Sequence, residues 1–223
     1  MGPMTSKLLD LLLPTRCVGC GVPWDPWCPA CATELGGPLP VRRPALATGP
    51  PAYALGGYRG AARAAVLAYK ERQRRELAVP LGSALAAALP WVPEARPAAD
   101  GTWWLVPVPS RRAAARKRGS QHVLVLARSC AAELARRGSP AAVAPALALR
   151  RGAVDSVGLD AVARAANLHG RVRPRSSGSP PAGTPVVLVD DVITTGATAA
   201  ACAGALTAAG LEVTAVLALT STT

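Results

Sequence analysis

One run of the sequence combines aliphatic, acidic and hydroxyl residues in an order that suits a phosphorylated sugar. Residues 186–198 read VVLVDDVITTGAT. The aliphatic start predicts a buried strand, and Asp190 and Asp191 stand at its carboxyl end, where open α/β sheets place their ligands. Adjacent carboxylates at that place suit sugar hydroxyls, which they contact directly or through a divalent cation.

The residues after the acidic pair suit a phosphate-binding loop. A loop at the start of a helix offers backbone N–H groups and the positive end of the helix dipole. Gly196 allows a tight turn, and threonine hydroxyls add donors. The alternative is an ordinary strand-to-helix turn with a threonine cap and solvated acids. The order of the whole run favours a phosphosugar site, and its candidate phosphate ligands are Thr194, Thr195, Gly196, Ala197 and Thr198.

Four cysteines near the N-terminus form a second candidate site. Cys17 and Cys20 make one CxxC pair, and Cys28 and Cys31 make another after a gap of seven residues. Each pair sets two thiolates on one tight turn, and two such turns close a tetrahedral zinc site. Two disulfides, a redox CxxC and an iron–sulfur cluster are the alternatives. With four protein thiolates the metal site would be closed and therefore structural.

The elements that must position these residues follow an α/β pattern. Hydrophobic runs predict strands at 54–58, 103–108, 186–189 and 212–219, and a weaker one at 141–149. Helical spacing of apolar residues predicts helices at 59–75, 77–89, 120–137 and 198–209, and a short amphipathic helix at 8–13. The last strand, helix and strand have the length of a parallel βαβ unit. Segments 38–51, 111–119 and 173–183 are predicted to be a Pro/Gly-rich linker, a basic loop and a further loop.

Charge and composition restrict the partners. A formal net charge of +12 over 223 residues favours nucleic acid, an anionic membrane surface or a substrate with several phosphates. No run of about 18 uncharged apolar residues predicts a transmembrane helix, and residues 8–13 lack the features of a signal peptide. We therefore expect a cytoplasmic protein, in which reduced CxxC pairs favour metal.

Several other residues that can do chemistry receive structural interpretations. His122 and His169 are interpreted as ordinary polar residues because no Ser/His/Asp or HExxH arrangement accompanies them. Cys130 and Cys202 lie on apolar faces of predicted helices and are assigned to the core. The sequence contains no Walker A motif, which argues against an ATP-hydrolysing motor.

Residues 186–198 closely resemble the 5-phosphoribosyl-1-pyrophosphate (PRPP) motif of the type I phosphoribosyltransferases. The resemblance implies that Asp190 and Asp191 bind the ribose hydroxyls and that residues 194–198 surround the 5-phosphate. It also implies Mg²⁺, chelated by pyrophosphate and ribose oxygens. The implied fold is Rossmann-like α/β, with a mostly parallel sheet flanked by helices.

Nearly the whole chain is similar to the ComF subgroup of these proteins. The similarity lies in the CxxC pairs, a tyrosine–glycine–basic segment, VPVP, RG-x-Q and RxxN, the last four at 58–70, 106–109, 118–121 and 164–167. ComF proteins usually read RGFNQ where this chain reads RGSQ. The resemblance implies a zinc-binding module over residues 1–40 and a phosphoribosyltransferase-type domain over 41–223. It also links the chain to natural competence and to incoming single-stranded DNA.

A phosphoribosyltransferase must also hold the leaving pyrophosphate. The candidates are Lys70, Ser110, Arg111, Arg112 and Arg118, and solvated surface arginines are the alternative for the cationic ones. Charge stabilisation of the leaving group is then expected to contribute most to catalysis. Two functions follow: a transferase that moves phosphoribose to a nitrogenous acceptor, or an accessory PRPP-binding protein of competence. Trp103 and Trp104 are expected either to stack on an acceptor base or to pack in the core.

Overall fold

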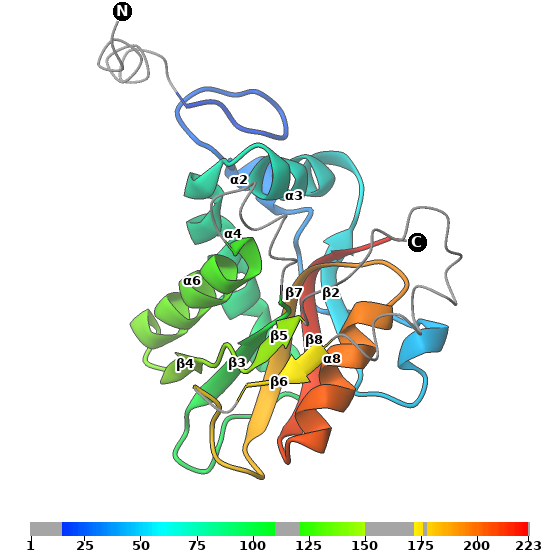
Figure 1. Ribbon diagram of the computed structural model, residues 1–223. Helices are drawn as coiled ribbons and strands as arrows, with labels where there is room; N and C mark the ends of the chain where they lie inside the picture. Colours follow the sequence, from blue (N-terminus) through cyan, green and yellow to red (C-terminus); the bar gives the residue numbers. More distant parts are fainter. Residues whose placement is uncertain (1–14, 110–120, 150–171, 176–177, 223) are drawn as a thin grey trace, which may run out of the picture.

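A computed structural model describes residues 15–109, 121–149, 172–175 and 178–222 (Figure 1). Its centre is a six-stranded sheet in the order β1-β2-β8-β7-β3-β4. Every neighbouring pair is parallel except β1 and β2, which are antiparallel. The strands in sheet order are Leu39–Pro40, Ala52–Gly57, Glu212–Ser221, Pro185–Ile193, Trp103–Pro107 and Ala141–Val143. The expected mixed α/β fold with a mostly parallel sheet is therefore confirmed.

Helices cover both faces of this sheet. One face packs against α3 (Gly60–Glu71), α4 (Ala78–Ala88) and α6 (His122–Arg136), and the other against α8 (Ala197–Ala208). Because both faces are covered, the central strands β7 and β8 are buried along almost their whole length. Burial on both faces explains why the sequences of these two strands are continuously aliphatic. The connection from β7 through α8 to β8 is the parallel βαβ unit that the sequence predicted.

Smaller elements complete the described chain. They are the short helix α2 (Pro29–Ala32), the 3-10 turns η1 (Pro44–Leu46), η2 (Arg75–Leu77) and η3 (Leu89–Trp91), and an antiparallel pair of β5 (Leu147–Leu149) with β6 (Val172–Pro174). The weak strand predicted at 141–149 is two strands, β4 and β5, because Pro145 lies between them and proline cannot donate to a ladder. Trp103 is buried in the core and Trp104 is half-buried, so core packing is their observed role.

The prediction of a linker at 38–51 was wrong. This segment contains β1, which pairs with the edge of the sheet, and η1, which packs against α8. The register pairs Leu39 with Ala54 and Pro40 with Tyr53. Proline is tolerated there because β1 is an edge strand. The predicted basic loop at 111–119 and the predicted helix at 8–13 lie outside the described residues.

The cysteine segment packs on the side of the sheet that α3, α4 and α6 cover. Cys17, Trp27, Cys28, Cys31 and Leu35 belong to the same core cluster as the buried residues of α3. Helix α2 lies against α3, as Figure 1 shows. A segment this short cannot bury a core of its own, so the main domain supplies one. Among the described residues, no helix is both long and apolar enough to cross a membrane.

Candidate functional site

The acidic pair lies inside β7. The strand continues to Ile193, beyond the predicted end at residue 189, because β8 pairs with it as far as Ser221. Asp190 is 8% exposed and Asp191 is 4% exposed. Buried acids in a strand of this kind need specific partners, since desolvation disfavours a carboxylate. The surroundings of the pair therefore decide what it can do.

The loop after β7 turns tightly into the N-terminus of α8. Gly196 has a φ of +79° and forms the N-cap of α8, and no side chain caps the helix from that position. Thr194 and Thr195 are exposed, and Thr198 is half-buried in the first turn. The Thr195 hydroxyl accepts the Ala197 N–H at 3.4 Å. The two exposed hydroxyls thus lie at the N-terminus of α8, where one of them accepts a helix N–H.

A segment that the sequence did not assign to the site supports this loop. The Nε of Arg43 donates to the carbonyl of Thr194 at 2.6 Å, and the same guanidinium donates to the carbonyl of Thr222. A Cβ built on Gly196 would lie 2.9 Å from Cδ1 of Leu46. Glycine is therefore required both by the positive φ and by the close approach of Leu46.

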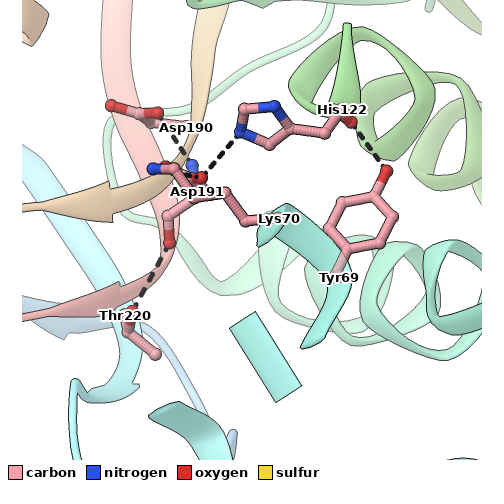
Figure 2. A network of polar contacts seen from close by, with 6 residues as sticks. All are labelled: Tyr69, Lys70, His122, Asp190, Asp191 and Thr220. Carbon is pink, nitrogen blue, oxygen red and sulfur yellow. Dashed lines mark hydrogen bonds and ion pairs between the residues drawn. The ribbon is translucent and has the colours of Figure 1, made fainter. Parts of the chain in front are cut away.

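Two nitrogen donors converge on one oxygen of Asp191, as Figure 2 shows. Lys70 Nζ and His122 Nε2 each lie 2.8 Å from its Oδ2. The side chains of His122 and Asp191 are 7% and 5% exposed, whereas that of Lys70 is 31% exposed. The hydroxyl of Thr220 lies 3.5 Å from the main-chain carbonyl of Asp191. The carboxylate is thus held from α3 and α6 while its backbone remains in the sheet.

The pKa values of the two acids are shifted in opposite directions. Burial raises the pKa of Asp191, but the hydrogen bond from His122 and the charge of Lys70 outweigh burial and hold this pKa below its usual range. Burial and the negative charge of Asp191 instead raise the pKa of Asp190 well above its usual range. Oδ1 of Asp190 accepts the Asp191 N–H at 2.8 Å. Asp191 is therefore the member of the pair that ionises more readily.

His122 is the site residue that sequence reasoning missed. It is the first residue of α6, and the Tyr69 hydroxyl donates to its main-chain carbonyl at 2.7 Å. The two rings also meet edge to face, with centroids 6.2 Å apart. Its position at a helix start after a strand was visible in the sequence, but its partner stands 69 residues away. Only the parallel pairing of β3 with β7 brings the start of α6 to the acidic pair.

Of the pyrophosphate candidates, only Lys70 lies among the described residues. Ser110, Arg111, Arg112 and Arg118 lie outside them. Strand β3 precedes these residues in the chain. Just after it, the Val108 N–H donates to the carbonyl of Val189 at 2.9 Å. The chain therefore leaves β3 beside the strand that carries the acids. The structure places Lys70 on Asp191 and describes the chain after β3 as far as Pro109.

The four cysteines of the N-terminal segment form one cluster. Their sulfur atoms all lie within 4.8 Å of one another, and Cys17, Cys28 and Cys31 are buried while Cys20 is exposed. All four are free thiols, and the sulfurs of Cys20 and Cys28 are 3.6 Å apart, well beyond a disulfide bond. This donor set fits a tetrahedral site. The cluster could therefore hold a structural metal ion such as zinc.

Backbone donors already favour a thiolate within the cluster. Burial raises the pKa of Cys17, but N–H groups of Cys20, Cys28 and Gly19 outweigh it and lower this pKa to about 6. The Cys28 N–H, for example, lies 3.5 Å from the Cys17 sulfur. Burial and the neighbouring thiols instead raise the pKa of Cys31, so Cys17 supplies the readiest thiolate for a metal ion.

Comparison with known proteins adds no assignment. No protein-family model matches the sequence, and no curated protein matches it significantly. The function is therefore inferred from the residues and geometry of the two sites.

Proposed function

We propose that this chain binds PRPP and is a phosphoribosyltransferase-family protein of the ComF type. One observation carries the proposal. A single continuous segment presents a buried acidic pair near the carboxyl end of a parallel strand and then a left-handed glycine at the N-cap of a helix. A vicinal diol matches the acidic pair, and a phosphate joined to that diol matches the glycine at the helix start. On this proposal the parallel sheet with helices on both faces is a type I phosphoribosyltransferase fold.

The 5-phosphate is assigned to the loop before α8. The first turn of a helix has N–H groups without partners inside the helix, and the dipole favours an anion there. The hydroxyls of Thr194, Thr195 and Thr198 are at the surface or half-buried, within the same loop. Gly196 carries no side chain that would keep a phosphate from the backbone. Ala197 contributes only its main chain.

The ribose and the pyrophosphate are assigned to the residues around β7. Asp190 and Asp191 accept the ribose hydroxyls, and Lys70 approaches the pyrophosphate together with the basic segment that contains Ser110, Arg111, Arg112 and Arg118. The Lys70 ammonium already stands 2.8 Å from Asp191 and is partly open to solvent. Mg²⁺ bound to PRPP would neutralise part of the pyrophosphate charge. These assignments rest on the resemblance of the motif and on the observed edge of the sheet.

The proposed reaction is transfer of phosphoribose to a nitrogenous acceptor. The bond between C1 of the ribose and the pyrophosphate oxygen breaks, and its electron pair leaves with pyrophosphate. A bond from the acceptor nitrogen to C1 forms, and the proton of that nitrogen is released. Cationic residues at the pyrophosphate stabilise the charge that develops there, and the protein is expected to accelerate the reaction mainly in this way.

A second candidate is an accessory PRPP-binding protein acting in competence with single-stranded DNA. The net charge of +12 favours it, because cationic proteins bind a phosphate backbone through counterion release. A cytoplasmic location suits both candidates and also the reduced cysteines. Binding of PRPP without turnover on any acceptor would select the accessory role over the transferase.

The decisive experiment is calorimetric titration with PRPP and Mg²⁺, paired with a pyrophosphate-release assay across nucleobases. We expect saturable binding by the natural protein and loss of at least about tenfold in affinity for Asp190→Asn and for Asp191→Asn. Asp100→Asn is the matched control, because Asp100 accepts a bond from the nearby Thr102 N–H in an exposed loop. Equal affinity in all four proteins would contradict the assignment of the acidic pair.

We also propose that the cysteine cluster holds structural Zn²⁺. Its four thiolate donors leave no position for substrate, so it acts on folding and not on the reaction. Metal analysis of purified protein should give close to one zinc per chain. Iron in place of zinc, with a visible charge-transfer band, would identify an iron–sulfur cluster instead. Protein that contains neither zinc nor iron would contradict the metal site.

A further inference from the structure

The buried carboxylate of Asp191 has two partners of very different exposure. Lys70 approaches through a long flexible side chain that is 31% exposed. His122 approaches through a short rigid side chain that is 7% exposed. Both contact the same oxygen, Oδ2, at 2.8 Å. The orientation of the carboxylate is therefore determined twice, once by a partly exposed lysine and once by a buried histidine.

Several contacts fix the imidazole where it stands. The hydroxyl of Tyr69 donates to the His122 carbonyl at 2.7 Å, and its ring lies edge-on to the imidazole. Tyr69 is itself 5% exposed in the core. Because an ionised carboxylate can only accept hydrogen bonds, the His122 nitrogen facing it, Nε2, carries a proton. His122 is thus a preset donor aimed at Asp191.

We propose that His122 is a positioning residue of the phosphoribose site, which keeps Asp191 in place when Lys70 turns from Asp191 to the pyrophosphate. This inference rests on the proposed binding of PRPP. In the ligand-free protein Lys70 stabilises Asp191, because a buried charge without partners is unfavourable. When the pyrophosphate arrives, it competes for the same ammonium. His122 then remains as the partner that keeps Asp191 oriented on the ribose.

Dissection of the ligand separates the two partners. Ribose 5-phosphate contains the sugar and the 5-phosphate but no pyrophosphate. Calorimetric titrations with PRPP and Mg²⁺ and with ribose 5-phosphate should be run on the natural protein, Lys70→Met, His122→Phe and His122→Gln. Lys70→Met should weaken PRPP about tenfold and leave ribose 5-phosphate within about threefold. His122→Phe should weaken both ligands by roughly tenfold, because Asp191 loses its fixed donor.

Rescue distinguishes positioning from simple packing. Glutamine can place an amide N–H near the position of Nε2, so His122→Gln should bind both ligands within about threefold of the natural protein. Cys130→Ala is the matched control, because Cys130 is 1% exposed in the same helix and two turns further along. It should lower thermal stability without changing either affinity. If His122→Phe does not fold, Tyr69→Phe replaces it, with a loss of about threefold for both ligands.

The outcomes separate this inference from the proposed function. Natural protein that binds neither ligand contradicts the proposed function and the role of His122 with it. Natural protein that binds both, together with unchanged binding in folded His122→Phe or in Tyr69→Phe used in its place, contradicts the role of His122 alone. Equal losses in His122→Gln and His122→Phe also contradict it, because a restored donor would then have no effect.

Discussion

The cysteine cluster and the acidic cluster reach a compact arrangement by opposite routes. The four cysteines come from one short segment, and their sulfurs lie within 4.8 Å of one another. The acidic cluster gathers Lys70 from α3, His122 from α6 and Asp191 from β7. A local motif shows its chemistry through spacing alone, whereas an assembled cluster exists only after the sheet has formed. The two should therefore respond differently to substitution.

The largest effect is expected from loss of the metal. Cys31→Ser removes a buried ligand from the cluster, and metal content should fall from about one equivalent to well under one half. The Tm should fall by about 10 °C, because ligation of a structural metal contributes several kcal/mol to folding. Metal analysis and calorimetric melting measure both quantities.

The control for that experiment is a cysteine that lies in the core and outside the four-cysteine cluster. Cys202 is fully buried in α8, outside the cluster, and Cys202→Ala should keep its metal. Hydrogen exchange should become faster in α2 and α3 of Cys31→Ser, because the cysteine segment packs on α3. The amides of β7 should stay protected. Equal exposure of β7 would mean that the two regions unfold as one unit.

The next largest effect is expected in the contiguous phosphate loop. Gly196→Ala must place a Cβ 2.9 Å from Leu46 Cδ1 at a φ of +79°. Left-handed backbone costs about 1–2 kcal/mol and the overlap roughly as much again, so the Tm should fall by about 8 °C. PRPP affinity should fall as well, because the loop must shift.

A second glycine isolates the two causes. Gly138 ends α6 with a φ of +81°, and an added Cβ there would meet nothing within 4 Å. Gly138→Ala should therefore show only the backbone cost, about 3 °C in Tm, with unchanged PRPP binding. If the two variants melt alike, the packing of Leu46 on the loop contributes nothing.

Elements whose residues lie close together in the chain were predictable from the sequence. The aliphatic runs predicted the central strands, and helical spacing predicted α6 at 120–137 against an observed His122–Arg136. The strand–loop–helix segment around Gly196 and the CxxC cluster were also predicted, since each lies in one short segment. In these places local sequence and tertiary structure demand the same residues.

The rest depends on contacts between distant segments. Arg43 and Leu46 looked like part of a linker, because nothing local shows that they will pack on the loop at Gly196. His122 looked like an ordinary polar residue, because its partner Asp191 is distant in the chain. The order of strands in the sheet creates both contacts, and periodicity does not encode that order.

A smaller effect of opposite sign is expected at Asp190. Its pKa is raised in the folded protein by burial and by Asp191, so the folded state retains a proton that the unfolded state loses. Its contribution to stability is therefore complete below the unfolded pKa, about 3.9, and is lost as the pH rises through the folded pKa. Asp190→Asn cannot ionise, so at pH 8 its Tm should be about 3 °C higher than that of the natural protein, and this gain should vanish near pH 4.

If PRPP binds as proposed, binding should change in the other direction, because Asp190→Asn replaces a carboxylate assigned to the ribose with a neutral amide. PRPP affinity should fall while stability rises, which is the behaviour of a site residue held at a cost to folding. Melting at several pH values and calorimetric titration with PRPP test the two halves separately. A variant that is less stable at pH 8 than the natural protein would contradict the raised pKa of Asp190.

The smallest effect is expected at the residue that joins the two regions. Glu34 belongs to the cysteine segment, and its carboxylate accepts the Ala62 N–H at 2.9 Å at the start of α3. Helix α3 carries Lys70 near its other end. A carboxylate at a helix N-terminus both accepts a hydrogen bond and complements the dipole. Glu34→Gln keeps the shape and removes the charge, and it should lower the Tm by about 2 °C.

The position of Lys70 should be almost insensitive to that change, because Asp191 and the core hold the far end of α3 independently of its start. PRPP affinity should therefore stay within about twofold. Glu133→Gln is the control, since Glu133 pairs with Arg136 and Arg137 at the end of its own helix. A loss of PRPP affinity specific to Glu34→Gln would show that the cysteine segment acts on the acidic cluster through α3, and the two regions would then be one functional unit.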